Sequence, residues 1–540
     1  MTKINTQSPP GTAARLAAFA PGSIKRNISV PLRTISVALC VIFSAIAASP
    51  SLIGQSTTDP QAEKVSLARA ARLIDSLPKD DPWLRTPDAS TLAWGESYLM
   101  HAFMDLYDAT GDPRYLTEVA FRGTRLLEHR DDRRKVADGS GHIRPAWSMA
   151  SKYVVAEGEL KDKAGNTVVR IRSTPSAYNN FTTVEVVPLS DDRFTLKVRN
   201  EHFKRYETFE NLSLSDTGER FVKQAVDDPM APYSTRPGDY HDKKSNLVRI
   251  EYVKPGYKGP LPAQQVALSP VPLAFAGYLG VIYHPMLRFS EAVRNQSGLK
   301  KLLPQAELFI KAAGESYEDA SLRLWREGPG DDEGYYLMCE KGESIPADNV
   351  GQPFNYLANH VCAQLALYRL TGKPEYLVRS GKMVNLFKNR LAYDSGKDLY
   401  TWNYWYEPMT TTGWKPEDNI SYNVKVYEGK ARTEDISHGG HDIHMVMAAY
   451  KMGIGFDSTD IKRFANTFLK NVLTADREKI TRLVDGSGDY QAYFNALHQW
   501  FVLSEVEPEV ARAGKYIYNL RSEETLPFTS KLLNCERFIK

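Results

Sequence analysis

The sequence predicts a mainly helical fold, built as a helical array or toroid and interrupted by one β-rich module. Three observations lead to this prediction: a near-repeat of one helical hairpin, long runs with helical periodicity in both halves of the chain, and a stretch of short β-type runs between them. With 540 residues, the chain is long enough to bury a large core.

The near-repeat consists of two segments, residues 106–116 and 367–377. Both read Leu-Tyr, two variable residues, Thr-Gly, a variable residue, Pro, a variable residue and Tyr-Leu. The glycine can take the left-handed conformation that ends a helix. The proline then falls at the start of the next helix, where its missing N–H costs nothing. Each segment is therefore predicted to be the turn of an antiparallel helical hairpin, and internal repeats of this kind indicate a helical array or toroid.

The coarse organisation follows from the periodicity of the apolar residues. Helical runs are predicted at residues 62–77, 90–109, 114–130, 270–296, 299–326, 355–370, 375–391, 437–453, 459–473 and 489–505. Between them lie short runs rich in β-branched and aromatic residues, separated by Asn, Asp and Gly turns. The predicted divisions are a linker at 51–61, a first helical part at 62–150, an inserted β-rich module at 151–258, a second helical part at 259–520 and a C-terminal tail at 521–540.

Residues 1–50 are predicted to be a signal peptide or an N-terminal anchor. The apolar run at 35–48 has the length of a signal-peptide core and is short for a membrane span. Basic residues precede it, and Ala45 and Ala47 provide a small-residue cleavage signal. Export to the periplasm, the cell surface or the medium is expected, with membrane association through residues 35–48 where the segment is retained.

The net charge argues against nucleic acid as a partner. Residues 1–58 contain five basic residues and no acidic residue, so leaving them out changes the net charge from +3 to −2. A nucleic-acid-binding protein would show a clustered basic excess instead. For the same reason, binding of an acidic polysaccharide would depend on a local basic pocket.

The stretch 432–444 concentrates titratable side chains where a helix is predicted to begin. Its candidate residues are Arg432, Glu434, Asp435, His438, His441, Asp442 and His444. Few folded segments carry so much titratable chemistry without using some of it. The backbone N–H groups at a helix start can also meet an anion. We therefore expect this stretch to contribute to the functional site.

A zinc site is one interpretation of these histidines. His438 shares a helix face with His441, and His441 shares one with His444, so either pair could bind Zn²⁺ together with Glu434 or Asp435. His444, however, lies about 240° around the helix from His438, so the three histidines do not converge. The segment also lacks the HExxH pattern. Neither a metal nor another cofactor is therefore predicted.

Acid–base chemistry on a sugar is the second interpretation. The aromatic segment 400–406 suits stacking on pyranose rings. Reactions at C5 of a uronic acid need a base, for which histidine titrates in the right range, and a partner for the carboxylate. The candidate catalytic residues are His438 or His441 as base, Tyr404 or Tyr406 as acid, and Glu434 or Asp435 to orient a histidine. The candidate substrate-binding residues are Asn355 and Arg432 for the carboxylate, with Trp94, His360, Trp402, Trp405 and Asp435.

Two other interpretations use the same residues. Hydrolysis would need a pair of carboxyl groups, drawn from Glu434, Asp435, Asp442 or Glu96. A purely structural interpretation assigns Asp435 to a helix cap and the aromatic segment to the core.

The repeated hairpins, the Trp402-Asn-Tyr-Trp405 segment and the Glu434-Asp-Ile-Ser-His438 segment together resemble secreted bacterial α/α-toroid proteins that act on polysaccharides. That class includes alginate-lyase-like, glucuronyl C5-epimerase-like and six-hairpin glycosidase-like proteins, and the resemblance covers residues 62–150 and 259–505. It implies an α/α toroid of the six-hairpin type, complete or incomplete, whose inner helices begin at one shared mouth. It further implies that Trp94, Asn355, His360, His438 and His441 approach one cleft.

The sequence therefore predicts an exported enzyme that cleaves a uronic-acid-containing polysaccharide by β-elimination. A glycoside hydrolase and a uronate C5-epimerase are the enzyme alternatives. The remaining alternative is a non-catalytic glycan-binding envelope protein, in which the β-rich insert would be the interaction module.

Overall fold

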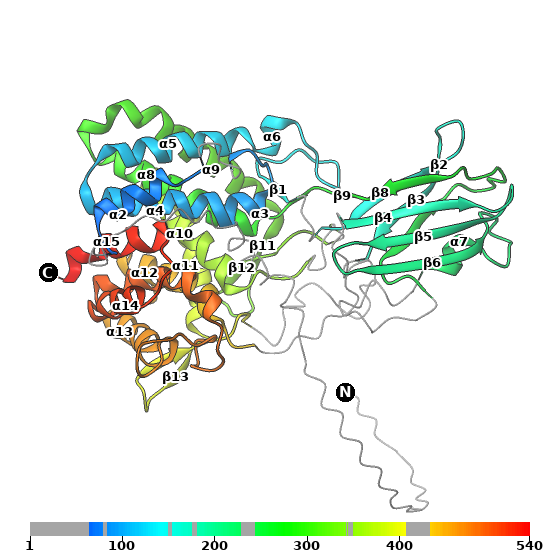
Figure 1. Cartoon of the computed structure of the whole chain (residues 1–540). Coiled ribbons are helices and arrows are strands. Elements are labelled where there is room, and N and C mark those ends of the chain that lie inside the picture. The colour runs from blue at the N-terminus through cyan, green and yellow to red at the C-terminus, as the bar shows by residue number, and fades with distance from the viewer. Residues whose placement is uncertain are drawn as a thin grey trace, which may run out of the picture. The chain divides into compact units, whose positions relative to one another are not determined.

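The computed structural model describes residues 64–78, 84–149, 154–174, 181–227, 244–341, 343, 349–406 and 432–539. The protein is mainly helical, and eight of its described strands form one β module, while the others form three short two-stranded sheets (Figure 1). The helical part and the β module each have their own hydrophobic core. The predicted leader at residues 1–50 and the linker at 51–61 lie outside the described residues. No helix of the described ranges is both long and apolar enough to span a bilayer.

Six helices contact one another in a closed circuit. They are, in chain order, α4 (Ser97–Thr110), α8 (Gly277–Arg294), α10 (Phe354–Thr371), α12 (Ile436–Lys451), η8 (Gln491–Glu505) and α15 (Leu526–Ile539). Each packs against the next, and α15 packs against α4. In α10 every residue from Phe354 to Leu367 is buried, as expected for a helix that is covered on all sides. The circuit brings side chains from distant parts of the sequence to one central space.

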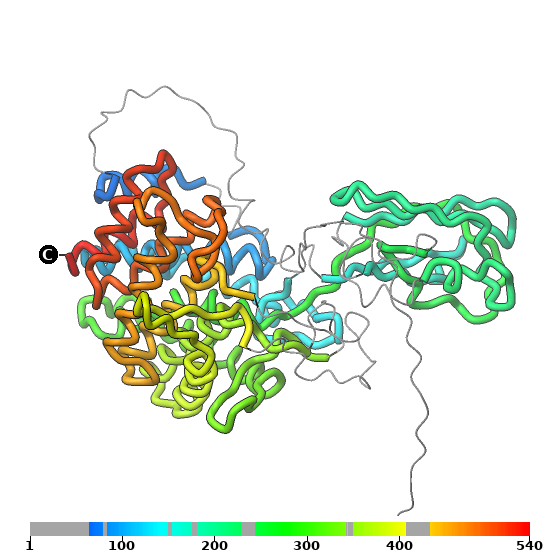
Figure 2. The backbone as a smooth tube through the Cα atoms, turned by 90° about the horizontal axis from the view of Figure 1, so that it is seen from below, coloured from blue at the N-terminus to red at the C-terminus, as the bar shows by residue number. Residues whose placement is uncertain are grey.

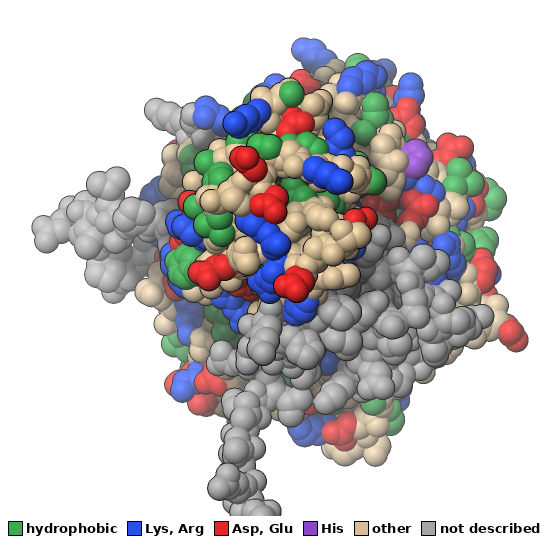
Figure 3. Space-filling model, turned by 90° about the vertical axis from the view of Figure 1, so that its right-hand side faces the viewer, with side chains coloured by type: hydrophobic (Ala, Val, Ile, Leu, Met, Phe, Trp, Pro, Cys, Tyr) green, Lys and Arg blue, Asp and Glu red, His purple; other side chains and the backbone are tan. Residues whose placement is uncertain are grey.

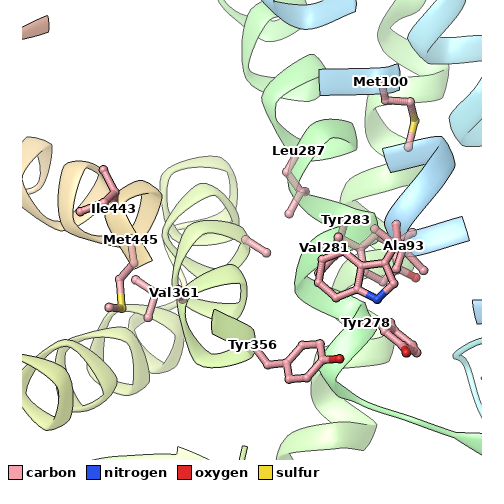
Figure 4. Close-up of a cluster of buried hydrophobic side chains, with 14 of the residues drawn as sticks. Ala93, Met100, Tyr278, Val281, Tyr283, Leu287, Tyr356, Val361, Ile443 and Met445 are labelled. Atoms are coloured by element: carbon pink, nitrogen blue, oxygen red, sulfur yellow. The ribbon is translucent and has the colours of Figure 1, made fainter. Parts of the chain in front are cut away.

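A second helix backs each helix of the circuit. These outer helices are α2 (Leu67–Asp75) on α15, α5 (Pro113–Glu128) on α4, α9 (Leu303–Leu324) on α8, α11 (Pro374–Lys388) on α10, α13 (Ser458–Thr467) on α12, and α14 (Glu509–Asn519) on η8. The helices α2 and α15, which come from opposite ends of the sequence, lie side by side (Figures 1 and 2). Apolar side chains of α8, α10 and α12 form a large part of the core, as Tyr283, Val361 and Ile443 illustrate (Figure 4).

The predicted turn chemistry of the repeated hairpins is confirmed. Gly111 ends α4 and Gly372 ends α10, both with φ of 72°. The following helices begin at Pro113 and Pro374. Both hairpins therefore pair a helix of the circuit with the helix behind it.

The β module consists of two antiparallel four-stranded sheets over one core. One sheet has the order β7-β3-β2-β9, with strands β7 (Val248–Val253), β3 (Thr167–Ser173), β2 (Ala156–Lys161) and β9 (Ser269–Pro270). The other has the order β6-β5-β4-β8, with strands β6 (Arg205–Leu212), β5 (Phe194–Asn200), β4 (Thr182–Pro188) and β8 (Gln264–Ala267). The module thus ends at β9 and not at residue 258, because β8 and β9 pair with β4 and β2.

The C-terminal segment 521–540, which we expected to be a tail, contains helix α15. Phe528, Leu532 and Cys535 lie on its buried side. This helix is needed to close the circuit, since it contacts both η8 and α4. Lys, Arg, Asp and Glu side chains are interspersed over the side of the molecule shown in Figure 3, in agreement with the small net charge.

Candidate functional site

The predicted active stretch forms the start of α12. Asp435 is its N-cap, and its Oδ1 accepts from the backbone N–H groups of Ser437 and His438, both at 3.0 Å. The Ser437 hydroxyl donates to the same oxygen at 2.6 Å. Capping by a carboxylate stabilises a helix start and fixes the geometry of its first turn. The neighbouring Glu434 is fully buried and accepts from the Asp435 N–H at 2.9 Å.

His438 is oriented by the same carboxylate. Its Nδ1 lies 2.9 Å from Asp435 Oδ2, and 11% of its side chain remains exposed. Burial alone would raise the pKa of the Asp435 carboxyl, but His438 and Ser437 outweigh burial and hold that pKa below its usual range. The negative charge of an ionised Asp435 beside Nδ1 favours the tautomer with its proton on that nitrogen, which leaves Nε2 of His438 able to take up a proton.

Glu434 and Asp442 form a buried carboxyl pair beneath His438. Asp442 Oδ2 accepts from the Trp402 indole N–H at 2.8 Å. Burial raises the pKa of both carboxyls, and the neighbouring Glu434 raises that of Asp442 further. Two buried carboxyls in contact favour holding one proton between them, so the pair carries less negative charge than its composition indicates.

His441 takes part in a hydrogen-bonded chain across four helices of the circuit. Asn359 Nδ2 on α10 lies 3.1 Å from His441 Nδ1 and donates to the Asn355 carbonyl at 2.7 Å. The bond to that carbonyl identifies the Asn359 amide nitrogen, so His441 Nδ1 accepts and its Nε2 carries the proton. His441 Nε2 lies 3.1 Å from the hydroxyl of Tyr98 on α4, to which Gln499 Nε2 also donates at 3.2 Å.

The protonation states of His441 and Tyr98 follow from the burial of both side chains. Burial lowers the pKa of His441 to about 3, with a further contribution from His438. Burial also raises the pKa of the Tyr98 phenol above its usual range. At neutral pH the His441 imidazole is therefore neutral and the Tyr98 phenol keeps its proton. Trp94 covers the His441 ring edge-on at 5.5 Å between ring centroids.

A small cavity of about 30 Å³ lies beside these residues, between the helices of the circuit. Its lining is rich in imidazoles, from His101, His284, His441, His444 and His498, and includes the Lys531 ammonium. The pKa of His101, His284 and His444 is well below the ordinary value, because burial disfavours the charged form and nearby positive charges add to the effect. Successive histidines of α12 therefore reach different places: His438 meets Asp435, while His441 and His444 line the cavity.

The predicted aromatic segment divides between the site and the core. The Tyr404 ring lies against the His438 ring at 5.1 Å between centroids. Trp402 is buried against Trp500, and Tyr406 is buried against Phe354. The indole N–H of the half-buried Trp405 donates to the Gly351 carbonyl at 3.0 Å. The structure thus places Tyr404 beside the candidate base and assigns Trp402 and Tyr406 to packing.

The two residues expected to hold a carboxylate lie at the starts of α10 and α12. The Arg432 guanidinium lies 3.7 Å from Asp435 Oδ2, and it covers the Tyr404 ring at 5.7 Å. Asn355 is buried, and neither its amide oxygen nor its amide nitrogen has a hydrogen-bond partner among the described residues. A buried amide of this kind needs an explanation, and a bound ligand would supply one.

His360 does not join these residues, contrary to the expectation that it binds substrate. It is fully buried, with Nδ1 at 3.0 Å from the Tyr317 hydroxyl and Nε2 at 3.1 Å from Gln352 Oε1. Glu96 is likewise removed from the site, since both its oxygens are held by Arg122 at 2.8 and 3.0 Å. Both residues are held in the core by polar contacts.

One group of described residues has its ligand atoms close enough to hold a metal ion, namely Glu434, Asp435 and His438, with these atoms within 4.8 Å of one another. His441, which the zinc interpretation paired with His438, is not part of it. Asp435 already receives hydrogen bonds from Ser437 and His438, as described above. The protein's own donors therefore account for the close approach of these three side chains.

Three residues of the site were not predicted from the sequence, namely Tyr98, Asn359 and Gln499. Asn359 lies one turn after Asn355 on the same predicted helix, so its amide was a visible signal. Tyr98 and Gln499 lie in ordinary apolar helices and carry no such signal. No protein family, curated protein or solved structure matches this chain.

Proposed function

We propose that this protein is an exported α/α-toroid enzyme of the six-hairpin type that cleaves a uronic-acid-containing polysaccharide by β-elimination. The closed circuit of six helices, each backed by another, supports the toroid class. One observation gives the main support for this reaction. Helix α12 presents an imidazole oriented by a carboxylate, His438, and one turn later an imidazole bonded to a phenol, His441 with Tyr98. A base and an acid are thereby available near the first turns of α12.

In the proposed reaction, His438 Nε2 removes the C5 proton of the uronate. The electrons of the C5–H bond form the C4=C5 double bond, and the C4–O4 bond breaks. Tyr98 gives its phenolic proton to the departing O4, while the N–H of His441 holds the phenol oxygen in place. Asn355 and Arg432 bind the uronate carboxylate, which makes the C5 proton more acidic. Tyr98 thus takes the role of acid that was expected for Tyr404 or Tyr406, and Tyr404 supports the His438 ring.

Hydrolysis receives less support from the same residues. It needs two carboxyl groups about 5–10 Å apart on either side of the scissile bond. Glu434 and Asp442 are instead in contact with each other and buried. Asp435 is engaged as a helix cap, and Glu96 is bound by Arg122. Epimerisation shares the abstraction of the C5 proton and differs in the return of a proton to the opposite face.

The test is to incubate the purified protein with alginate, glucuronan and chondroitin and to follow the ultraviolet absorbance of the unsaturated uronate product. Elimination predicts a rise in absorbance together with chain cleavage. New reducing ends without that absorbance would indicate hydrolysis. Incorporation of deuterium at C5 without cleavage would indicate epimerisation. Binding without any chemical change would overturn the enzyme proposal and favour a glycan-binding protein.

A further inference from the structure

The outward face of the sheet β6-β5-β4-β8 carries a row of polar and aromatic side chains. Because side chains alternate along a strand, Val184 and Val198 point into the core of the module and their neighbours point outward. Thr183 on β4, Arg199 on β5 and Tyr206 on β6 are direct cross-strand partners. These three side chains therefore lie next to one another on the outward face.

Aromatic rings collect at the end of this row. Phe181 precedes β4, and its ring lies 5.5 Å from that of His202 in the turn between β5 and β6. Phe203 follows in the same turn, 4.9 Å from His202. The Tyr206 hydroxyl donates to Glu201 Oε2 at 3.3 Å, which ties this ring to the turn.

These rings are unusually open to solvent. Phe181 is 42% exposed, Phe203 36% and Tyr206 60%. A single exposed apolar side chain needs no explanation, but several that adjoin one another mark a binding surface. The rings adjoin hydroxyl and amide groups on the same outward face, from Thr183, Thr208 and Gln265. Flat rings beside hydrogen-bonding groups suit a sugar ring, which has apolar C–H faces and an equatorial rim of hydroxyls.

Cationic side chains lie on this face next to the rings. Lys197 and Arg199 point outward beside Glu185, at 3.8 and 3.3 Å. In the turn, Lys204 lies 3.3 Å from Glu201. Glu210 follows Thr208 on the same side of β6, so three cations share this face with three carboxylates. Lys197 and Arg199 are both near the one carboxylate of Glu185, so a carboxylate of an acidic polysaccharide can pair with one of them.

We propose that this aromatic face, made of Phe181, Lys197, Arg199, His202, Phe203 and Tyr206, binds a uronate polymer away from the catalytic residues. The rings stack on pyranose faces, and Lys197 and Arg199 pair with uronate carboxylates. The identity of the sugar rests on the proposed function, while the binding itself requires no catalysis. The face would hold the polymer near the enzyme and lower the KM for long chains only.

Affinity gel electrophoresis of the full chain in gels containing alginate tests the proposal, with His438→Gln as the background so that no substrate is consumed. Gels with dextran and with dextran sulfate provide an uncharged and a non-uronate polyanionic comparison. Tyr206→Ala and Phe181→Ala are each expected to weaken alginate binding by about tenfold, as for the loss of one central aromatic contact. Tyr252→Ala is the matched control, because Tyr252 is an exposed tyrosine on β7 of the other sheet.

Equal retardation of Tyr206→Ala and the background protein by alginate would overturn the proposal. Retardation by dextran or dextran sulfate as strong as that by alginate would overturn its uronate specificity. Failure of the proposed function is distinguishable, because it would abolish product formation and leave the retardation and its loss in Tyr206→Ala unchanged. If both proposals hold, Tyr206→Ala raises the KM for alginate and leaves kcat on a short oligouronate unchanged.

Discussion

His441 Nε2 lies 3.1 Å from the Tyr98 hydroxyl, which joins residues 343 positions apart in the chain. The contact depends on the closed circuit, since α4 and α12 come from opposite halves of the sequence. The Asn359 amide fixes the tautomer of His441, so the imidazole donates and the phenol oxygen accepts. A phenol held in this way keeps its own proton for transfer.

The first prediction concerns the acid. Tyr98→Phe retains the ring that packs beside Trp94 and removes only the hydroxyl. Kinetic measurements on the susceptible polymer should show that kcat falls by about 100-fold or more, with KM nearly unchanged, because the lost interaction is the proton transfer. Tyr404→Phe is the comparison, since Tyr404 was one of the two acids expected from the sequence. A larger loss of kcat in Tyr404→Phe would return the acid to Tyr404.

The turns and caps that depend only on residues close together in the sequence were predicted well. The hairpin turns at Gly111 and Gly372 follow from residues a few positions apart, and so does the cap at Asp435. The partners Tyr98 and Gln499 do not, because neither residue differs from an ordinary helical side chain until the circuit is closed. The spacing of Phe528, Leu532 and Cys535 was amphipathic in the sequence and could have predicted α15.

The failure at His360 has a similar physical origin. His360 follows Asn359 directly, and successive residues of a helix point about 100° apart. Asn359 therefore faces His441, while His360 faces Tyr317 on α9. The sequence does not give the rotation of α10 about its own axis, so it cannot decide whether Asn359 or His360 faces the site.

The second prediction concerns the orientation of the base. Asp435→Asn keeps an amide oxygen that can cap α12, because Asn and Asp cap helices about equally well. The amide nitrogen cannot accept the Nδ1 proton of His438, so the imidazole loses its tautomer and its orientation. Steady-state kinetics should show that kcat falls by about 100-fold or more, as for other carboxylate–imidazole pairs. The loss of thermal stability should be small.

Asp457→Asn is the control for this substitution. Asp457 caps α13 in the same way, with its side chain accepting from Thr459 and Asp460. It makes no contact with the candidate site. Equal losses of kcat in the two variants would show that Asp435 acts only through the helix cap.

The third prediction concerns stability in acid. Burial lowers the pKa of His360 and His441 to about 3 and that of His498 to about 4, from an ordinary value of 6.5. Below pH 6.5 these histidines are therefore protonated in the unfolded chain and remain neutral in the folded protein. Because the unfolded chain binds more protons, the free energy of unfolding falls as the pH drops toward 3 or 4. At pH of about 5, each such histidine lowers that free energy by about 2 kcal/mol.

The difference between variants isolates this effect. The raised pKa of Glu434 and Asp442 acts in the opposite direction, because those carboxyls hold protons in the folded state. Urea unfolding of His360→Gln at pH about 7.5 and about 5 should therefore show a smaller loss in acid than the wild-type protein shows. The exposed residue His202 serves as the control, and His202→Gln should retain the wild-type loss. Equal losses in all three proteins would contradict the assignment to His360.

The last prediction tests how closely α8 and α10 must approach for the site to form. Gly280 on α8 faces α10 so closely that a Cβ atom would lie 2.4 Å from the Asn359 carbonyl carbon and 2.6 Å from its oxygen. Backbone atoms cannot yield as a flexible side chain can, so Gly280→Ala must push α10 away. A decrease of about 1–3 kcal/mol in the free energy of unfolding is expected, as for other overpacked positions.

The same displacement reaches the site, because Asn359 fixes the tautomer of His441. Gly280→Ala should therefore lower kcat even under conditions where the protein is fully folded. Gly298→Ala is the control, since a Cβ atom there meets nothing within 4 Å. Urea titration and kinetics on both variants provide the measurement. A Gly280→Ala protein with normal stability and normal kcat would mean that α8 and α10 do not pack this closely, and the chain from Asn359 to Tyr98 would then lose its support.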